Sequence, residues 1–132
     1  MKALIISLFL MLASFSSQAY FSIFANVNDV EKSIQTDSDV IGYKYSNSNL
    51  IIKYNTGIVI GYRFDTEDSI VNSVFLFKID QDFSSLFEYF DDTTSKIDTG
   101  VWIKIEDGVK YIIEFKFNKE EEVYYLIVYP KI

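Results

Sequence analysis

Clustered carboxylates are the residues of this chain that could do chemistry. They stand beside hydroxyl groups in "FDTEDS", residues 64–69, and in "FDDTTSKID", residues 90–98. Hard oxygen ligands of this kind suit Ca2+, and a facing pair of carboxylates can hydrolyse a glycosidic bond. Neither segment has the spaced Asp-x-Asp-x-Asp-Gly pattern of a calcium loop. We therefore interpret both segments as solvated turns and predict no metal and no cofactor.

Histidine and cysteine are both absent from the 132 residues. The chain therefore lacks the commonest general base, a thiolate nucleophile and the ligands of a zinc cage. It also has no glycine-rich phosphate loop, nucleophile elbow or Ser-x-x-Lys element in a suitable context. These absences predict a protein that is not an enzyme. A carboxylate-based hydrolase of envelope polysaccharide and a calcium-stabilised structural protein remain as alternatives.

Residues 1–19 have the pattern of a cleaved secretory signal peptide. A positive start is followed by an apolar run from Ala3 to Ala13, and the small residues Ser17 and Ala19 precede the expected cut. The run is too short to cross a membrane, which takes about 20 residues. We expect an exported protein, periplasmic or extracellular, with no stable membrane insertion after cleavage. Residues 20–132 are expected to form a single domain.

The chain is acidic, with 19 acidic and 12 basic residues. The predicted leader contains one of the basic residues and no acid, which leaves a formal charge of −8 for the mature chain. Such a charge disfavours nucleic acid and anionic membrane surfaces, since both attract basic proteins. A basic protein is the partner that this charge favours.

Short apolar-alternating runs from residue 40 onward are typical of antiparallel strands. They predict strands near residues 40–46, 49–54, 58–64, 69–79, 100–105, 109–117 and 123–129. Short helices are expected at 28–35 and 82–90, and a further strand at 20–25. The predicted fold class is α+β, mainly antiparallel meanders with one or two short helices. A β-sandwich or half-barrel with a capping helix is the alternative.

The hairpin "LIIKYNTGIVIGYRF", residues 50–64, is expected to turn through a three-residue loop, 55–57, that ends in glycine. This loop places Leu50 opposite Tyr62 and Ile52 opposite Ile60. Apolar residues then face apolar residues, as a buried sheet face requires.

The hairpin "VWIKIEDGVKYIIEF", residues 101–115, raises a choice of register. A two-residue Asp107-Gly108 turn would mix polar and apolar side chains on both faces. A three-residue loop, 106–108, instead places Ile103 opposite Tyr111. We predict the longer loop because burial sets register.

The two hairpins also resemble each other. At an offset of 51 residues they share the pairs Ile52/Ile103, Lys53/Lys104, Gly57/Gly108 and Phe64/Phe115. A candidate helix precedes each hairpin, which indicates a duplicated helix-plus-meander unit. Coincidence among similar hairpins is the alternative. Secreted inhibitor domains built from tandem helix-plus-sheet repeats share this outline, an analogy of fold without a matching motif.

An apolar row is predicted on the face opposite the core. With the loop 106–108, and with a loop 118–122 that pairs Phe117 with Val123, three apolar residues fall in one cross-strand row: Trp102, Ile112 and Val128. A helix or a second sheet could cover this row. If it is exposed, it becomes a partner site with Trp102 as its anchor.

The helix at 82–90 ends in Asp91 and Asp92, although acids are unfavourable at the C-terminal end of a helix. Asp82 is placed to cap its first amides. If the two meanders align in the same direction, the acids at the end of the helix join two acidic turns at one end of the molecule. This acidic rim consists of Asp65, Glu67, Asp68, Asp91, Asp92, Glu120, Glu121 and Glu122. Separate solvated loops are the alternative.

Together these features predict a small exported acidic binding protein. The expected type is an inhibitor or immunity protein that binds a basic protein through the acidic rim or the Trp102 row. The sequence leaves the oligomeric state open.

Overall fold

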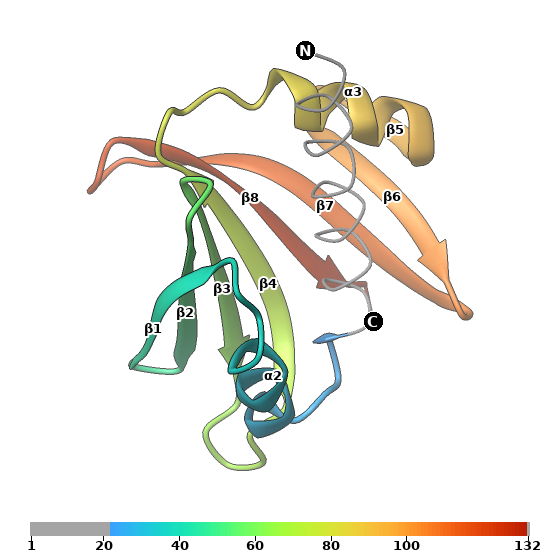
Figure 1. Cartoon of the computed structure of the whole chain (residues 1–132). Coiled ribbons are helices and arrows are strands. Elements are labelled where there is room, and N and C mark those ends of the chain that lie inside the picture. The colour runs from blue at the N-terminus through green and yellow to red at the C-terminus, as the bar shows by residue number, and fades with distance from the viewer. Residues whose placement is uncertain (1–21, 132) are drawn as a thin grey trace.

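The computed structural model describes residues 22–131, and the predicted signal peptide lies outside them. These residues form eight antiparallel strands in one open sheet and two short helices (Figure 1). The elements are α2 (Val27–Ile34), β1 (Val40–Ser46), β2 (Asn49–Tyr54), β3 (Ile58–Phe64), β4 (Val71–Lys78), α3 (Ser84–Thr93), β5 (Ser95–Asp98), β6 (Val101–Glu106), β7 (Val109–Asn118) and β8 (Val123–Pro130). The predicted α+β class is confirmed, and the single sheet takes the place of the sandwich alternative.

Two parts of the predicted element list are wrong. Residues 22–25 form no strand, and the only pairing near them is an isolated bridge between Asn26 and Ile70. The strand β5 was not expected, because all four of its residues are exposed and no buried alternation marks them.

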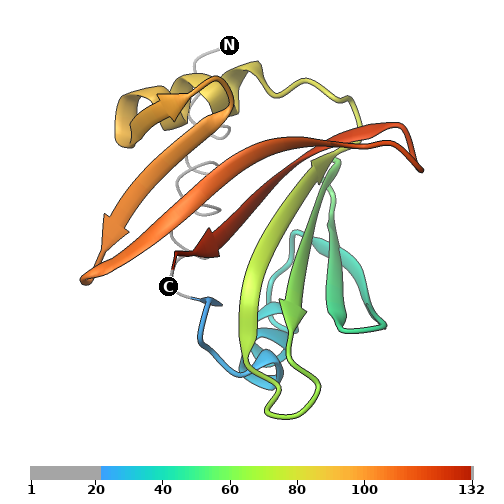
Figure 2. The same cartoon turned by 180° about the vertical axis from the view of Figure 1, so that it is seen from behind.

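The sheet consists of two halves of equal design. Each half is a helix followed by a four-stranded meander, and the strand order is β1-β2-β3-β4-β8-β7-β6-β5. From either edge of the sheet to its centre, the four strands of a half follow one another in chain order. This arrangement is the one expected of a duplicated helix-plus-meander unit. The halves meet where β4 pairs with β8, and these strands lie side by side at the centre of Figure 2. The strands of one half cross those of the other at a steep angle, as expected of a strongly twisted sheet.

One buried row of side chains crosses this junction. Six consecutive cross-strand neighbours on β2, β3, β4, β8, β7 and β6 are each at most 1 % exposed: Leu50, Tyr62, Val74, Val128, Ile113 and Trp102. We call this set the core row. Burying such side chains contributes about 1.5–3 kcal/mol each, so the core row joins the two halves into one hydrophobic core.

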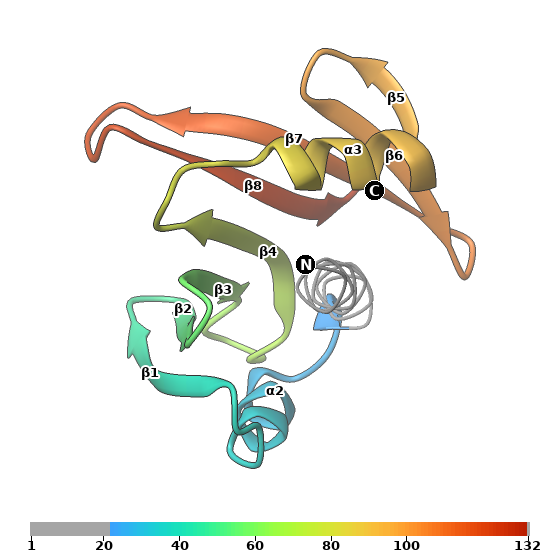
Figure 3. The same cartoon turned by 45° about the horizontal axis from the view of Figure 1, so that its top comes forward.

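Both helices cover the face of the sheet that carries the core row, which we call the inner face. Val30 and Ile34 of α2, and Leu86 and Phe90 of α3, belong to the same buried cluster as the core row. Figure 3 shows α3 lying along the half that contains β6 and β7, with α2 beside the other half. Tyr45 on β1 further ties α2 to the sheet, since its hydroxyl donates to Oε1 of Glu31 at 2.6 Å.

The first hairpin turns as predicted. Leu50 pairs with Tyr62 and Ile52 pairs with Ile60. Gly57 has a φ of 81°, a left-handed conformation that glycine adopts without steric cost. The three-residue loop is therefore confirmed.

The register predicted for the second hairpin is wrong by one residue. Asp107 and Gly108 both have positive φ, 51° and 80°, as a two-residue type I′ turn requires. Trp102 then pairs with Ile113, and Lys104 pairs with Tyr111 on the inner face. The sheet tolerates this lysine because its ammonium reaches the end of α3 and donates to the carbonyl of Thr93 at 3.4 Å.

The hairpin between β7 and β8 is also one residue shorter than predicted. Phe117 pairs with Tyr124, and Asn118 pairs with Val123. The loop therefore spans residues 119–122, and Asn118 stabilises it by accepting from the amides of Glu120 and Glu121.

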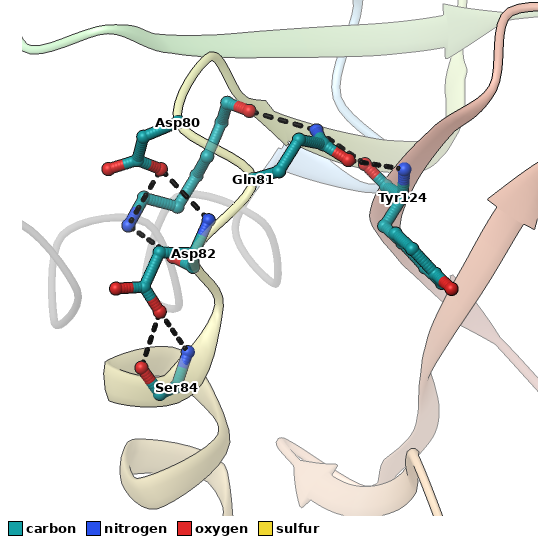
Figure 4. Close-up of polar contacts among 6 residues, drawn as sticks. Asp80, Gln81, Asp82, Ser84 and Tyr124 are labelled. Carbon is teal, nitrogen blue, oxygen red and sulfur yellow. Dashed lines mark hydrogen bonds and ion pairs between the residues drawn. The ribbon is translucent and has the colours of Figure 1, made fainter.

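The linker between the halves is held against β8 by a side-chain amide (Figure 4). Nε2 of Gln81 donates to the carbonyls of Lys78 at 3.0 Å and Tyr124 at 3.4 Å, and Oε1 accepts from the Tyr124 amide at 2.7 Å. Gln81 thus pairs with Tyr124 as a backbone peptide would. Phe83 is the N-cap residue of α3, and Asp82 precedes it; as predicted, Asp82 satisfies a first free amide of the helix, because Oδ1 accepts from the Ser84 amide at 3.1 Å and from its hydroxyl. These bonds lower the pKa of Asp82.

Replacing Gln81 tests this linker. We expect Gln81→Ala to lower the free energy of unfolding by about 1–2 kcal/mol, because the Tyr124 amide and carbonyl lose their partner. Gln81 has a φ of 57°, so Gln81→Gly loses the same bonds but relieves backbone strain and should be the more stable of the two variants. Urea unfolding followed by circular dichroism measures both. Two variants as stable as the wild type would contradict the role of the amide.

Candidate functional site

Trp102, the predicted anchor of an exposed row, lies in the core. It is 1 % exposed, and its ring packs against Phe87 and Phe90 of α3 with centroids 5.3 Å and 5.5 Å away. The predicted row does not exist, because Ile113 rather than Ile112 lies between Trp102 and Val128. One-residue errors in the β6–β7 and β7–β8 turns together caused this mistake. Since side chains alternate between faces, these errors exchanged the inner and outer residues of β7 relative to β6 and β8.

The acids at the end of α3 have different environments. Oδ1 of Asp91 accepts from the indole Nε1 of Trp102 at 2.8 Å and lies 3.8 Å from Nζ of Lys96. These donors offset the unfavourable helix dipole at this position. Asp92 is exposed and has no such contact within residues 22–131. Asp91 therefore serves the structure, as the hydrogen-bond acceptor of a buried tryptophan.

The predicted acidic rim is split between the ends of the sheet. Its turns, 65–68 and 119–122, lead into β4 and β8, and these two strands run antiparallel. The turns must therefore lie at opposite ends of the sheet, as Figure 1 shows. The meanders do not align in the same direction, which was the premise of the rim.

The acids of the β3–β4 turn stabilise the turn itself. Oδ1 of Asp65 accepts from the Glu67 amide and Oδ1 of Asp68 from the Ile70 amide, each at 2.9 Å. Across residues 22–131, no three His, Cys, Asp or Glu side chains gather as they would around a metal ion. The carboxylates of Asp65 and Asp68 thus have local structural roles.

The face of the sheet opposite the helices, the outer face, is a different kind of surface. Its middle row crosses β1, β2, β3, β4, β8, β7 and β6 and consists of Lys44, Ile51, Gly61, Phe75, Ile127, Glu114 and Val101. Neither described helix covers this row, since its apolar residues belong neither to the core cluster nor to the residues packed against it. Sequence reasoning missed this surface.

Aromatic and aliphatic side chains occupy the centre of the outer face. We call Phe75 and Phe77 on β4, with Tyr125 and Ile127 on β8, the central strip; all four are half-buried. The ring of Phe77 lies 5.6 Å from that of Phe75 and 5.4 Å from that of Tyr125. The ring of Phe75 rests on Gly61, where an added Cβ would come within 2.1 Å of it. Glycine at this mid-strand position therefore lets the aromatic ring lie flat on the sheet.

Basic residues flank the central strip on both sides. Lys44, Lys53 and Arg63 lie on β1 to β3, Lys110 and Lys116 lie on β7, and all five are exposed. We call these five residues the basic flanks. Cross-strand pairing with Ile51, Val59, Ser73, Ile105 and Tyr125 places them on the outer face.

Glu114 is the only acid in the interior of a strand on the outer face. Its carboxylate accepts from the hydroxyl of Tyr129 and lies 3.2 Å from Nζ of Lys116. The bond to Glu114, with burial, raises the pKa of Tyr129 to about 12. The charge of Glu114 is thus offset within the face, and the outer face carries more positive than negative charge although the whole chain is acidic.

No protein-family model, no curated protein and no solved structure matches this chain. Within residues 22–131, neither helix is long and apolar enough to span a membrane. The function of the outer face must therefore be inferred from its own geometry. A broad sheet face with an apolar centre and a charged border is suited to contact with another protein.

The bond between Trp102 and Asp91 can be tested by substitution. Asp91→Ala leaves a buried indole N–H without its acceptor, and a bond to a charged group contributes about 1.5–3 kcal/mol. Loss of the unfavourable dipole interaction returns about 0.3–1 kcal/mol, so we expect a net loss of about 1–2 kcal/mol. Trp102 is the only tryptophan, and its fluorescence during urea unfolding reports the change.

Asp92→Ala is the matched control. It removes an acid from the same helix end without touching Trp102, so its stability should equal or slightly exceed that of the wild type. Asp91→Asn keeps an acceptor oxygen and should fall between the other two. Equal stability of the Asp91→Ala and Asp92→Ala variants would show that the hydrogen bond has no effect.

Proposed function

We propose that this protein is a small exported binding protein of the inhibitor or immunity type, and that it recognises another protein with the outer face of its sheet. The observation that carries the proposal is the central strip. It places Phe75, Phe77 and Tyr125 in contact with one another on a face that neither described helix covers.

The dimensions of the outer face support a protein partner. Eight strands about 4.8 Å apart span roughly 34 Å, and three rows of side chains extend over about 20 Å along the strands. Measured along the twisted sheet, the area is roughly 700 Å2, of the same order as the ~800 Å2 that each partner contributes to a standard interface. A small ligand would use only a fraction of such a surface.

The composition of the central strip, with Arg63 beside it, is also that of the centre of a protein interface. Aromatic residues and arginine are enriched in interfaces, and their energetic centre is apolar and surrounded by polar residues. Here the central strip provides the apolar centre, and the basic flanks with Glu114 provide the polar border. The sheet is a rigid platform, so binding would cost little ordering of the backbone.

The positions of the acids favour binding over hydrolysis. Of 19 acidic residues, 16 lie in helices, turns or linkers, Asp98 and Glu106 end strands, and only Glu114 lies inside a strand. Glu114 is engaged by Tyr129 and Lys116. A glycoside hydrolase needs two carboxylates that face each other across the substrate, and the outer face offers one.

A capture experiment tests the proposal. The exported chain, immobilised through a C-terminal tag, is incubated with extracellular or periplasmic extract of its source, and retained proteins are identified by mass spectrometry. Phe75→Asp places a charge in the central strip, so we expect it to reduce retention of the partner at least roughly tenfold. Ile79→Asp is the control, because Ile79 is 78 % exposed and lies beyond the end of β4.

A second pair of variants changes no charge. Gly61→Ala displaces the ring of Phe75, whereas Gly42→Ala on β1 meets nothing within 4 Å. We expect only the first to weaken retention. A protein retained equally by the wild type, Phe75→Asp and Gly61→Ala, or no retained protein at all, would contradict binding through the outer face. Trp102 fluorescence confirms that each variant is folded.

A further inference from the structure

We infer that the partner presents an acidic surface to the outer face, with carboxylates placed on both sides of an apolar centre. This inference rests on the proposed docking function and adds the chemistry of the partner. It differs from the basic partner that the net charge of the chain favours.

The first step of the argument is the distribution of basic residues between the two faces. Eight of the 12 basic residues lie in strands, three on the inner face and five on the outer face. All three inner residues have a partner: Lys78 is 3.6 Å from Asp80, Lys96 is 3.8 Å from Asp91, and Lys104 donates to the Thr93 carbonyl. The fold therefore satisfies the basic side chains that lie on the covered face.

The second step is the state of the basic flanks. Lys116 is paired with Glu114, while the other four side chains make no hydrogen bond or ion pair with any part of residues 22–131: Lys44, Lys53, Arg63 and Lys110. They stand exposed at the border of an apolar strip in a chain that has 19 acids. Of the 19 acids, only Glu114 lies inside a strand on this face, and it is engaged by Lys116. Water solvates the four unpaired groups in the free protein, and they remain available to acidic groups of a partner.

The third step is the arrangement of the charges. Three basic residues lie on one side of the central strip and two on the other, so the positive charge borders the strip on both sides. A partner with carboxylates around an apolar patch would pair with both borders while its apolar atoms cover Phe75 and Phe77. Opposite charges at an interface border set its specificity and orientation.

The same arrangement disfavours a polyanion. Nucleic acids and anionic membranes select densely basic surfaces through many phosphate contacts, whereas here few basic groups surround a wide apolar strip. The net charge of −7 for the chain would repel an extended polyanion. A folded acidic protein can contact the outer face without approaching the acidic turns at either end of the sheet.

Charge reversal on the outer face tests the inference. The extract proteins are first separated by ion exchange into an acidic and a basic pool, and each pool is applied to the immobilised chain. We expect the retained protein to come from the acidic pool. Retention should fall at least roughly tenfold in Lys53→Glu/Arg63→Glu and in Lys110→Glu/Lys116→Glu, because both introduce like charges opposite the partner.

The control variant is Lys119→Glu. It makes the same kind of change at an exposed lysine in the β7–β8 turn, away from the outer face, and should leave retention unchanged. A retained protein from the basic pool, a second copy of this chain, a retained polysaccharide, or retention that both double variants leave unchanged would each overturn the inference.

The outcomes separate this inference from the proposed function. If Phe75→Asp abolishes retention while both double variants preserve it, the docking face stands and the acidic partner is wrong. If Phe75→Asp has no effect, the docking function itself fails. The double variants replace exposed side chains only, so their Trp102 fluorescence should match that of the wild type.

Discussion

The pairing of β4 with β8 is the interaction on which the rest of this molecule depends. It comprises three residue pairs, of which two are buried on the inner face: Val74 with Val128, and Leu76 with Leu126. Each half alone is a four-stranded meander with one short helix, and a unit of that size buries enough apolar surface for marginal stability only. The junction extends the core row across six strands, so each half completes the core of the other. With no cysteine in the chain, packing across this junction replaces the disulfide bonds that many small secreted domains use.

The direction of the same pairing determines where the charges lie. Because β4 and β8 are antiparallel, the two halves point in opposite directions, and equivalent turns occupy opposite ends of the sheet. The acidic turns are thereby separated, and both helices come to lie on the inner face. The outer face carries the other residues of each strand, which alternate along the strand with the buried core residues. The antiparallel pairing of β4 with β8 thus accounts both for the acidic turns at the two ends of the sheet and for the separate, basic outer face.

The local elements of this fold could be predicted from the sequence, and the contacts between distant elements could not. Helices and seven strands follow from periodicity, and the loop 55–57 follows from the glycine that ends it. The register of β6 with β7 was wrong because the polar Lys104 was expected to face solvent. In the structure its long side chain reaches a helix end instead. The acceptor of Trp102 also depends on tertiary packing, since Asp91 comes from α3. Nothing in the sequence near β6 indicates that contact.

The sequence does contain a sign of the apolar outer face, but the alternation pattern alone does not show which face of a strand enters the core. The strands "VNSVFLFK" and "VYYLIVYP" are apolar at consecutive positions, which means that both of their faces are apolar. In a single sheet with helices on one side, only one of those faces can enter the core. The apolar residues on the other side, Phe75, Phe77 and Tyr125 among them, lower the solubility of the protein unless a partner covers them. A protein that keeps four basic side chains unpaired beside such a strip gives up favourable interactions that its many acids could have supplied. In the proposed complex, an acidic surface of the partner would supply those interactions.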